Sequence, residues 1–195
     1  MLRFPAIPIL TAAIVALPRA DLAAQGTGPE PATAAVAVLP AALYNDQANL
    51  REASDSDQAV LATEVLRSRL VERLGDLVVS YRRVDSLARS PEAMAIAGGV
   101  PCQVKVACAR AVAAGAGARW VVMAKVSKTS SLIWLLSAQL IRVSTGEIVL
   151  DDSTELKGDP GTMVRVGVRS FADRVARTVR AGGRTTNFPS GSPGS

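Results

Sequence analysis

The sequence contains no histidine, only two cysteines, and 4% aromatic residues. Without histidine the chain can form neither a Ser-His-Asp nor a Cys-His nucleophile, and it can form no His-ligated metal site. Two cysteines alone cannot build a structural zinc site. Because these absences remove the commonest catalytic equipment, we expect a protein that is not an enzyme and that carries no cofactor.

The residues that are present indicate a folded, mainly aliphatic domain. Apolar types make up 49% of the 195 residues and charged types 20%, which excludes an intrinsically disordered chain of low hydrophobicity. The length suits one domain with a leader. Because aromatics are scarce, Val, Leu, Ile and Ala must form the core. The net charge of +5 is modest, and with few aromatic side chains for stacking we expect no nucleic-acid partner.

The first 24 residues have the pattern of a secretory signal peptide. Arg3 gives a short positive start, residues 6–17 form an apolar stretch, and Leu22-Ala23-Ala24 supplies small residues for cleavage before Gln25. The apolar stretch is shorter than the ~20 residues that a transmembrane helix needs. We therefore expect export to the periplasm and a mature chain without a transmembrane segment. The alternative is an uncleaved leader that anchors the protein to the membrane.

The rest of the chain divides into a linker, one domain and a tail. Residues 25–32 are a Gly/Pro-rich linker, and residues 183–195 have the composition of a disordered tail. Between them, the pattern predicts a single mixed α/β (α+β) domain, 33–182, with a mixed sheet of about five strands. Its elements are ordered strand, helix, strand, helix, helix, strand, strand, strand, helix. The expected strands are 34–39, 77–84, 119–126, 132–143 and 148–156. The expected helices run from residue 56 or 57 to 74, from 85 to 97 with a break around Pro91, from 104 to 114, and from 164 to 180.

The last helix has the clearest pattern in the chain. Its apolar side follows three- and four-residue spacing and consists of Val164, Val168, Phe171, Val175 and Val179. Its polar side carries Arg165, Arg169, Asp173, Arg177 and Arg180. Such an arginine row can contact an anionic polymer, lipid headgroups or an acidic partner, or it can be only the solvated side of an amphipathic helix. The four arginines are therefore candidate partner-binding residues.

A second candidate surface follows the first expected strand. Asn45 and Asp46 begin a polar stretch with three further carboxylates, Glu52, Asp55 and Asp57. Ligands often bind at the carboxyl ends of strands in α/β sheets, so Asn45 and Asp46 are candidates for a cation- or sugar-binding loop. The alternative is a solvated loop that leads into a helix capped by Ser56 or Asp57.

Cys102 and Cys108 are the only thiols, and both lie in the part of the chain that we expect to be exported. Cysteines this close in an oxidising compartment usually form a disulfide, and Pro101 keeps Cys102 outside the regular helix. Two free buried thiols and a redox-active pair are the alternatives. Because the spacing is not that of thioredoxin-like motifs and no histidine can activate either thiol, we favour a structural disulfide.

Several segments together resemble an exported proteobacterial family of unknown function that is often encoded near periplasmic quinoprotein alcohol dehydrogenases. These are the strand 36–40 (VAVLP) leading to Asn45-Asp46, the Cys102 to Cys108 segment, the helix and turn 109–118 (ARAVAAGAGA), the strand 121–128 (VVMAKVSK) and the turn 144–149 (STGEIV). The resemblance covers roughly residues 33–180 and implies the layout of the amino-terminal domain of TolB. It also implies a periplasmic location and an envelope protein as partner, such as a quinoprotein dehydrogenase system.

Three functions are compatible with these observations. The first, which we favour, is a periplasmic accessory protein that binds an envelope protein and catalyses no reaction. The second is an envelope structural factor that binds anionic surfaces through the arginines of the last helix. The third is an enzyme or a thiol-redox factor that uses Cys102 and Cys108, or Asp46 with its neighbouring carboxylates. A carboxylate dyad is disfavoured, because neighbours such as Asp151 and Asp152 point to opposite faces of a strand.

Overall fold

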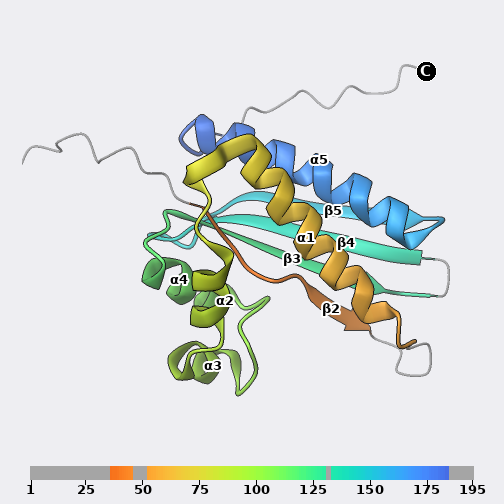
Figure 1. The fold of residues 1–195 in the computed structure, drawn as a ribbon, viewed down its shortest axis with the longest axis horizontal. Helices are drawn as coiled ribbons and strands as arrows, with labels where there is room; N and C mark the ends of the chain where they lie inside the picture. Colours follow the sequence, from red (N-terminus) through yellow and green to blue (C-terminus); the bar gives the residue numbers. More distant parts are fainter. Residues whose placement is uncertain (1–35, 46–51, 131–132, 185–195) are drawn as a thin grey trace, which may run out of the picture. The chain divides into compact units, whose positions relative to one another are not determined.

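The sheet is organised around the strand β3 (Trp120–Lys128), as Figure 1 shows for the computed structural model. β1 (Val36–Val38) and β2 (Ala42–Asn45) follow one another along the same edge of β3, both parallel to it. On the other edge, β3 pairs with β4 (Ile133–Arg142), and β4 pairs with β5 (Ile148–Lys157), both antiparallel. The expected mixed sheet of five strands is therefore confirmed.

The structure describes residues 36–45, 52–130 and 133–184, all within the unit Thr33–Ser195. The predicted signal peptide, the linker, nearly all of the predicted tail, and Asp46 lie outside the described residues and stay predictions. Within the described ranges, no helix is both long and apolar enough to cross a membrane.

The fifth strand is not the one that the sequence predicted. The stretch 77–84 was expected to be a strand, but Val78 forms only a single parallel bridge with Val36, after which the chain enters α2 (Tyr81–Ala88). A run of β-branched residues favours a strand locally. Here, however, β1 is only three residues long and offers no ladder to extend. The missed strand β2 has four residues, too few to show an alternating pattern.

α1 (Asp55–Leu74) and α5 (Pro160–Arg180) lie side by side over one face of the sheet (Figure 1). The even-numbered side chains of β3 point to this face and pack with apolar residues of both helices, including Leu70 and Phe171. Burying a side chain of this size stabilises the fold by about 2 kcal/mol relative to leaving it exposed. The larger part of the core therefore lies between this helix pair and the sheet.

Three short helices cover only part of the opposite face of the sheet (Figure 1). They are α2, α3 (Pro91–Ala97) and α4 (Val106–Gly115). Val121 and Met123 of β3 are buried under this group, whereas further along β3 on the same face Lys125 is only half-buried. One half of this face is therefore open.

The break predicted around Pro91 separates α2 from α3. Pro91 is the first residue of α3, where a missing N–H costs no hydrogen bond. The Ser90 hydroxyl accepts a hydrogen bond from the Ala93 N–H at 3.2 Å and caps the helix. The predicted start of this helical region is wrong, because α2 begins at Tyr81 rather than at residue 85.

The last helix ends at Arg180, as the expected range 164–180 predicted, and Gly182-Gly183 follow it. Gly183 has φ +85°, a conformation that glycine adopts at little cost, and its N–H donates to the Thr178 carbonyl at 2.8 Å. A Cβ at this position would lie 2.4 Å from Cη2 of Trp120. Glycine therefore ends α5 and allows the chain to pass closely over the buried Trp120.

Candidate functional site

The arginines predicted as a partner surface, Arg165, Arg169, Arg177 and Arg180, are all exposed on α5. The opposite side of α5 is buried against the sheet, as the apolar spacing predicted. At the start of the helix, the Asp159 carboxylate accepts a hydrogen bond from the Thr162 N–H at 2.7 Å. This contact lowers the pKa of Asp159 and fixes the first turn. The sequence thus predicted where these arginines lie, and their binding role stays a prediction.

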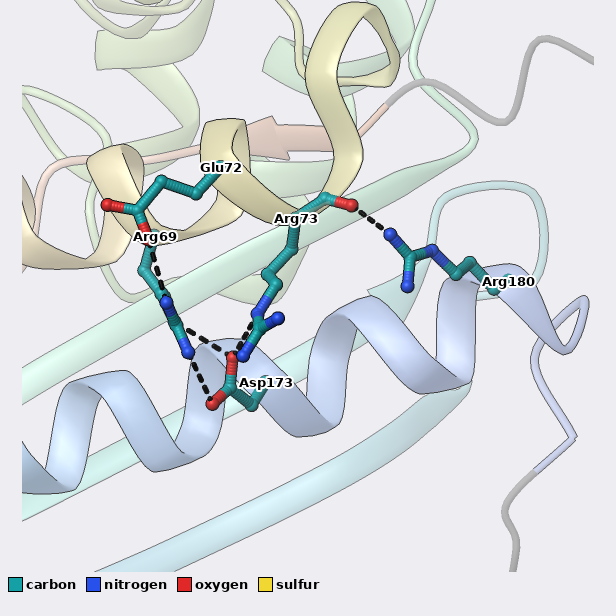
Figure 2. Close-up of polar contacts among 5 residues, drawn as sticks. All are labelled: Arg69, Glu72, Arg73, Asp173 and Arg180. Carbon is teal, nitrogen blue, oxygen red and sulfur yellow. Dashed lines mark hydrogen bonds and ion pairs between the residues drawn. The ribbon is translucent and has the colours of Figure 1, made fainter.

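One carboxylate ties α1 to α5, as Figure 2 shows. Asp173 of α5 accepts hydrogen bonds from Nε and Nη2 of Arg69 at 2.9 and 3.1 Å, and from Nε of Arg73 at 2.8 Å. Arg69 also donates to Glu72 at 2.7 Å through Nη1. These paired guanidinium groups hold the pKa of Asp173 down to about 2. At neutral pH Asp173 is therefore an anion whose charge is already balanced.

A hollow of about 200 Å³ lies next to this tie, at the end of the helix pair. It is lined by Arg73, Asp173, Ala176, Arg177 and Arg180. Arg180 donates to the backbone carbonyl of Arg73 (Figure 2), which holds its guanidinium in place. Arg177 forms no ion pair with any described residue. Since Asp173, the one carboxylate among the described lining residues, is already bound by two arginines, this hollow has spare positive charge.

A second hollow, of about 220 Å³, lies on the other side of Asp173 along the same helix pair. Arg165 and Arg169 of α5 line it together with Arg69, Glu64 and Glu72. Neither Arg165 nor Arg169 pairs with a carboxylate in the described part of the chain. We call the six arginines of the two hollows the arginine seam: Arg69, Arg73, Arg165, Arg169, Arg177 and Arg180.

The carboxylates after β1 and β2 have a different role from the one the sequence suggested. Asp55 is not solvated: its side chain is 3% exposed and accepts a hydrogen bond from Lys128 Nζ at 2.9 Å. The Glu52 N–H and the Asn45 amide donate to the other oxygen of Asp55, at 2.9 and 3.4 Å. Glu52 also pairs with Lys128 at 3.0 Å. A cation site in this loop is therefore disfavoured, because an ammonium group already occupies these carboxylates.

This buried pair replaces the predicted helix cap. α1 begins at Asp55, directly after Ser54, and no side chain caps its first turn, so the predicted cap at Ser56 or Asp57 is wrong. Burial alone raises the pKa of Asp55, but the Glu52 N–H and Lys128 outweigh that effect and bring it below its ordinary value. The hydrogen bond to Asp55 raises the pKa of Lys128 against the opposing effect of burial. Both groups are therefore charged at neutral pH.

Cys102 and Cys108 form a disulfide, as favoured from the sequence, with their Cα atoms 5.9 Å apart. Both side chains are fully buried, and the Cys102 N–H donates to the Ala88 carbonyl of α2 at 2.9 Å. The bridge therefore joins the loop after α3 to α4 inside the smaller part of the core. A disulfide buried in this position supports a structural role for the two cysteines over a role in redox chemistry.

Asp151 and Asp152 point to opposite faces of β5, as predicted. Asp151 accepts a hydrogen bond from the Gln139 amide at 3.3 Å on the open face of the sheet, whereas Asp152 pairs with Arg174 of α5. They cannot act together as acid and base. In the described ranges, no group of three or more Cys, Asp or Glu side chains is placed to hold a metal ion.

Arg69, Arg73 and Lys128 are not among the site residues that the sequence predicted. Arg69 and Arg73 interrupt the apolar side of α1, and such an interruption could have marked them as contacts to another helix. Lys128 ends a strand whose other residues are mostly apolar. This local pattern does not indicate which carboxylate Lys128 pairs with. Its partner Asp55 lies 73 positions earlier in the chain, so only the fold could reveal the pair.

Several solved structures are similar to this chain. The LpoB C-terminal domain from Escherichia coli is 23% identical, covers 69% of this chain and 90% of that chain, and has a TM-score of 0.45. The PelC dodecamer from Paraburkholderia phytofirmans is 15% identical, with coverage of 74% and 90% and a TM-score of 0.40. TolB from Acinetobacter baumannii is 15% identical, with coverage of 76% and 28% and a TM-score of 0.40. At identities and TM-scores this low, the likeness assigns no function to this chain.

Sequence comparison gives the family. No curated protein matches the chain. The family DUF3280, described as Protein of unknown function (DUF2380), matches residues 34–174. This range includes the disulfide and the contact of Asp173 with Arg69 and Arg73, and it confirms the resemblance to a family of unknown function. The chain therefore belongs to the DUF3280 family.

Proposed function

We propose that this protein is a periplasmic binding protein without catalytic activity, and that its arginine seam binds an acidic segment of an envelope protein. The observation that carries this proposal is the set of three exposed arginines that pair with no carboxylate of the described residues, Arg165, Arg169 and Arg177. They flank the Asp173 tie, which holds α1 and α5 together. The family resemblance supports a component of a quinoprotein dehydrogenase system as the partner.

The spacing of these three arginines restricts the kind of partner that can bind them. Arg169 and Arg177 are eight residues apart on α5, which corresponds to ~12 Å along a helix. An extended peptide covers this length in about four residues. We therefore expect a partner segment with two carboxylates, or two clusters of carboxylates, about four residues apart. Arginine suits this task because its planar guanidinium can hold a carboxylate through two hydrogen bonds.

The rest of the chain supports binding rather than chemistry. The whole sequence lacks histidine, the cysteines form a buried disulfide, and Asp151 and Asp152 point apart. The predicted signal peptide is compatible with the disulfide, because disulfides persist in oxidising compartments such as the periplasm. These features favour an exported accessory protein over an enzyme or a thiol-redox factor.

Charge reversal on the seam tests this function. The variant Arg169→Glu/Arg177→Glu replaces two exposed arginines, so it should fold normally. Arg82→Glu/Arg89→Glu is the matched control, since Arg82 and Arg89 are exposed on and just after α2, and neither has an ion pair with a described residue. Affinity-tagged protein is cross-linked in cells of the native host, and the captured envelope proteins are quantified by mass spectrometry.

We expect the wild type and the control variant to capture the same envelope protein, and the seam variant to capture it about tenfold less. Equal capture by all three proteins would contradict the proposal. Loss of binding to anionic vesicles or peptidoglycan by the seam variant, without loss of any protein partner, would replace it with the envelope structural function. Full-length protein with its leader intact in the cytosol would contradict the periplasmic location.

A further inference from the structure

The open half of the sheet contains a hollow of about 440 Å³, on the face opposite the arginine seam. Two neighbouring cross-strand pairs form its floor: Met123 lies opposite Gln139, and Lys125 lies opposite Ser137. Residues two apart on a strand project from the same face, and directly opposed residues lie side by side. These four side chains therefore form one continuous surface under the hollow.

Two exposed apolar side chains form the walls of this hollow. Tyr44 of β2 is 51% exposed, and Val104 of the loop before α4 is 48% exposed. The loop is held in place by the Cys102–Cys108 disulfide and by the hydrogen bond from the Cys102 N–H to the Ala88 carbonyl. An anchored loop keeps Val104 opposite the sheet instead of allowing it to collapse into the core. The hollow is therefore a preformed feature of the fold.

Two hydrogen-bond donors on the floor are available to a ligand. Nζ of Lys125 lies 5.0 Å from the centre of the Tyr44 ring but pairs with no carboxylate of the described residues. The hydroxyl of Ser137, opposite Lys125 in the ladder, makes no hydrogen bond within the described part of the chain. By contrast, the Gln139 amide is used by Asp151 at 3.3 Å. One ammonium group and one hydroxyl thus lie side by side beside an apolar surface.

We propose that this hollow binds a small monocarboxylate with an apolar body. The Lys125 ammonium and the Ser137 hydroxyl match the single negative charge and the two oxygens of a carboxylate. The apolar body lies over Met123, between Tyr44 and Val104. Pockets of ~300–1,000 Å³ with a mostly apolar lining and a few polar groups are typical of small-molecule sites. Among the described lining residues there is one lysine and no arginine, a composition that suits a carboxylate better than a phosphate.

Binding can be measured with two probes, decanoate and 4-phenylbutanoate, each below the concentration at which it forms micelles. The probes are titrated into the purified protein, and amide chemical shifts report the site while calorimetry reports the affinity. We expect saturable shifts at Tyr44, Lys125 and Ser137. Decanol, which has the same chain length as decanoate but no charge, should bind about tenfold more weakly, because a charge-assisted hydrogen bond is lost.

Variants of the floor and the wall separate a specific site from a merely apolar patch. Lys125→Gln should weaken decanoate binding about tenfold, and Ser137→Ala about threefold. Val104→Asp should weaken it further, because it places a negative charge in the wall. Lys157→Gln is the matched control, since Lys157 is an exposed lysine on the same face of the sheet, and it should leave the affinity unchanged. Circular dichroism spectra of the variants should match that of the wild type.

Four results would overturn the proposal. The first is that neither probe gives saturable shifts. The second is that the shifts map away from the hollow. The third is that Lys125→Gln binds decanoate as tightly as the wild type. The fourth is that decanol binds as tightly as decanoate. None of these results would affect the arginine seam, which lies on the other side of the sheet.

Discussion

The two faces of the sheet are covered by helices in different ways. One face carries α1 and α5, with 20 and 21 residues, and the half-exposed contacts of Asp173 with Arg69 and Arg73 join them. The other carries α2, α3 and α4, with 8, 7 and 10 residues; a disulfide links the loop after α3 to α4, and the Cys102 N–H donates to the Ala88 carbonyl of α2. Short helices are marginal on their own because each buries little apolar surface. A covalent link therefore takes the place of helix length on the second face.

This difference also produces two kinds of surface. On the fully covered face, only the outer sides of the helices remain for binding, and there the arginine seam presents fixed positive charge. On the half-covered face, the sheet itself is accessible, and its pleated side chains form the floor of a hollow next to an anchored loop. The first surface suits an extended acidic segment, and the second suits a small ligand.

The largest effect is expected from Phe171→Ala, which removes the largest side chain of α5 from the main core. Phe171 is 1% exposed, so the substitution leaves a cavity and should lower the free energy of unfolding by about 4 kcal/mol. The control is Val166→Ala, because Val166 lies on the same helix and is 59% exposed. It should change the free energy of unfolding by less than about 0.5 kcal/mol. Urea denaturation measures both. If Phe171→Ala costs less stability than removal of the disulfide by Cys102→Ser/Cys108→Ser, the α1–α5 face does not contribute the larger part of the stability.

A somewhat smaller effect is expected at the start of α1. Asp55→Ala leaves the Lys128 ammonium buried without its main partner, and it should cost on the order of 3 kcal/mol. Asp57→Ala, at an exposed position in the same turn, should have little effect in the same denaturation experiment. The double variant Asp55→Leu/Lys128→Met should lose less stability than Asp55→Ala, because it removes both charges. If the double variant instead loses more stability than Asp55→Ala, the attraction between Asp55 and Lys128 itself stabilises the start of α1. The cost of Asp55→Ala would then not be due to a buried lysine left without a partner.

Removal of the disulfide tests how much it stabilises the short helices on the half-covered face of the sheet. Cys102→Ser/Cys108→Ser should lower the free energy of unfolding by about 2 kcal/mol, as expected for a short closed loop. Amide hydrogen exchange should become faster in α3 and α4, while α1 and α5 keep the protection of the wild type. Uniform acceleration over the whole domain would show that the two faces unfold as a single unit.

The smallest effect is expected from Asp173→Asn, and it depends on pH. The pKa of Asp173 is about 2 in the folded protein, against an ordinary value of 3.8. Because the folded pKa is the lower one, this carboxylate stabilises the fold above pH ~4, and its contribution is lost as the pH falls to ~2. Asp173→Asn should therefore cost about 1 kcal/mol at pH 7 and almost nothing at pH 2. Thermal melts at both pH values measure this, and an equal loss at both would show that charge is not the cause.

The features that the sequence predicted correctly depend on local signals. α5 has an apolar side at helical spacing, a terminating Gly182-Gly183, and no competing pattern. The expected strands 132–143 and 148–156 are β4 and β5; every second residue of β4 is apolar and buried, and a turn with Gly146 at φ +80° follows. The break before α3 follows from Pro91. In each case the residues that decide the structure are neighbours in the chain, so the local sequence is enough to predict it.

The predictions that failed depended on distant partners. Residues 77–84 have the composition of a strand, but the hydroxyl of Tyr81 donates to the Arg67 carbonyl at 2.8 Å as the chain turns into α2. β2 is a strand only because β3 lies next to it. In the candidate site, the arginines of α5 were predicted, but Arg69 and Arg73 meet Asp173 across 100 positions or more of sequence.

By itself, the sequence determined the helix faces, the hairpin, the pair of cysteines and the absence of histidine chemistry. These follow from composition and from spacing within a few residues. Only the tertiary structure decided which charges are neutralised and which stay available. Asp173 and Lys128 are held by partners far away in the chain, while Arg177 and Lys125 are left without a carboxylate among the described residues. The physical reason is that the energy of a charge depends on the groups that folding brings near it, and the order of residues along the chain does not contain those distances.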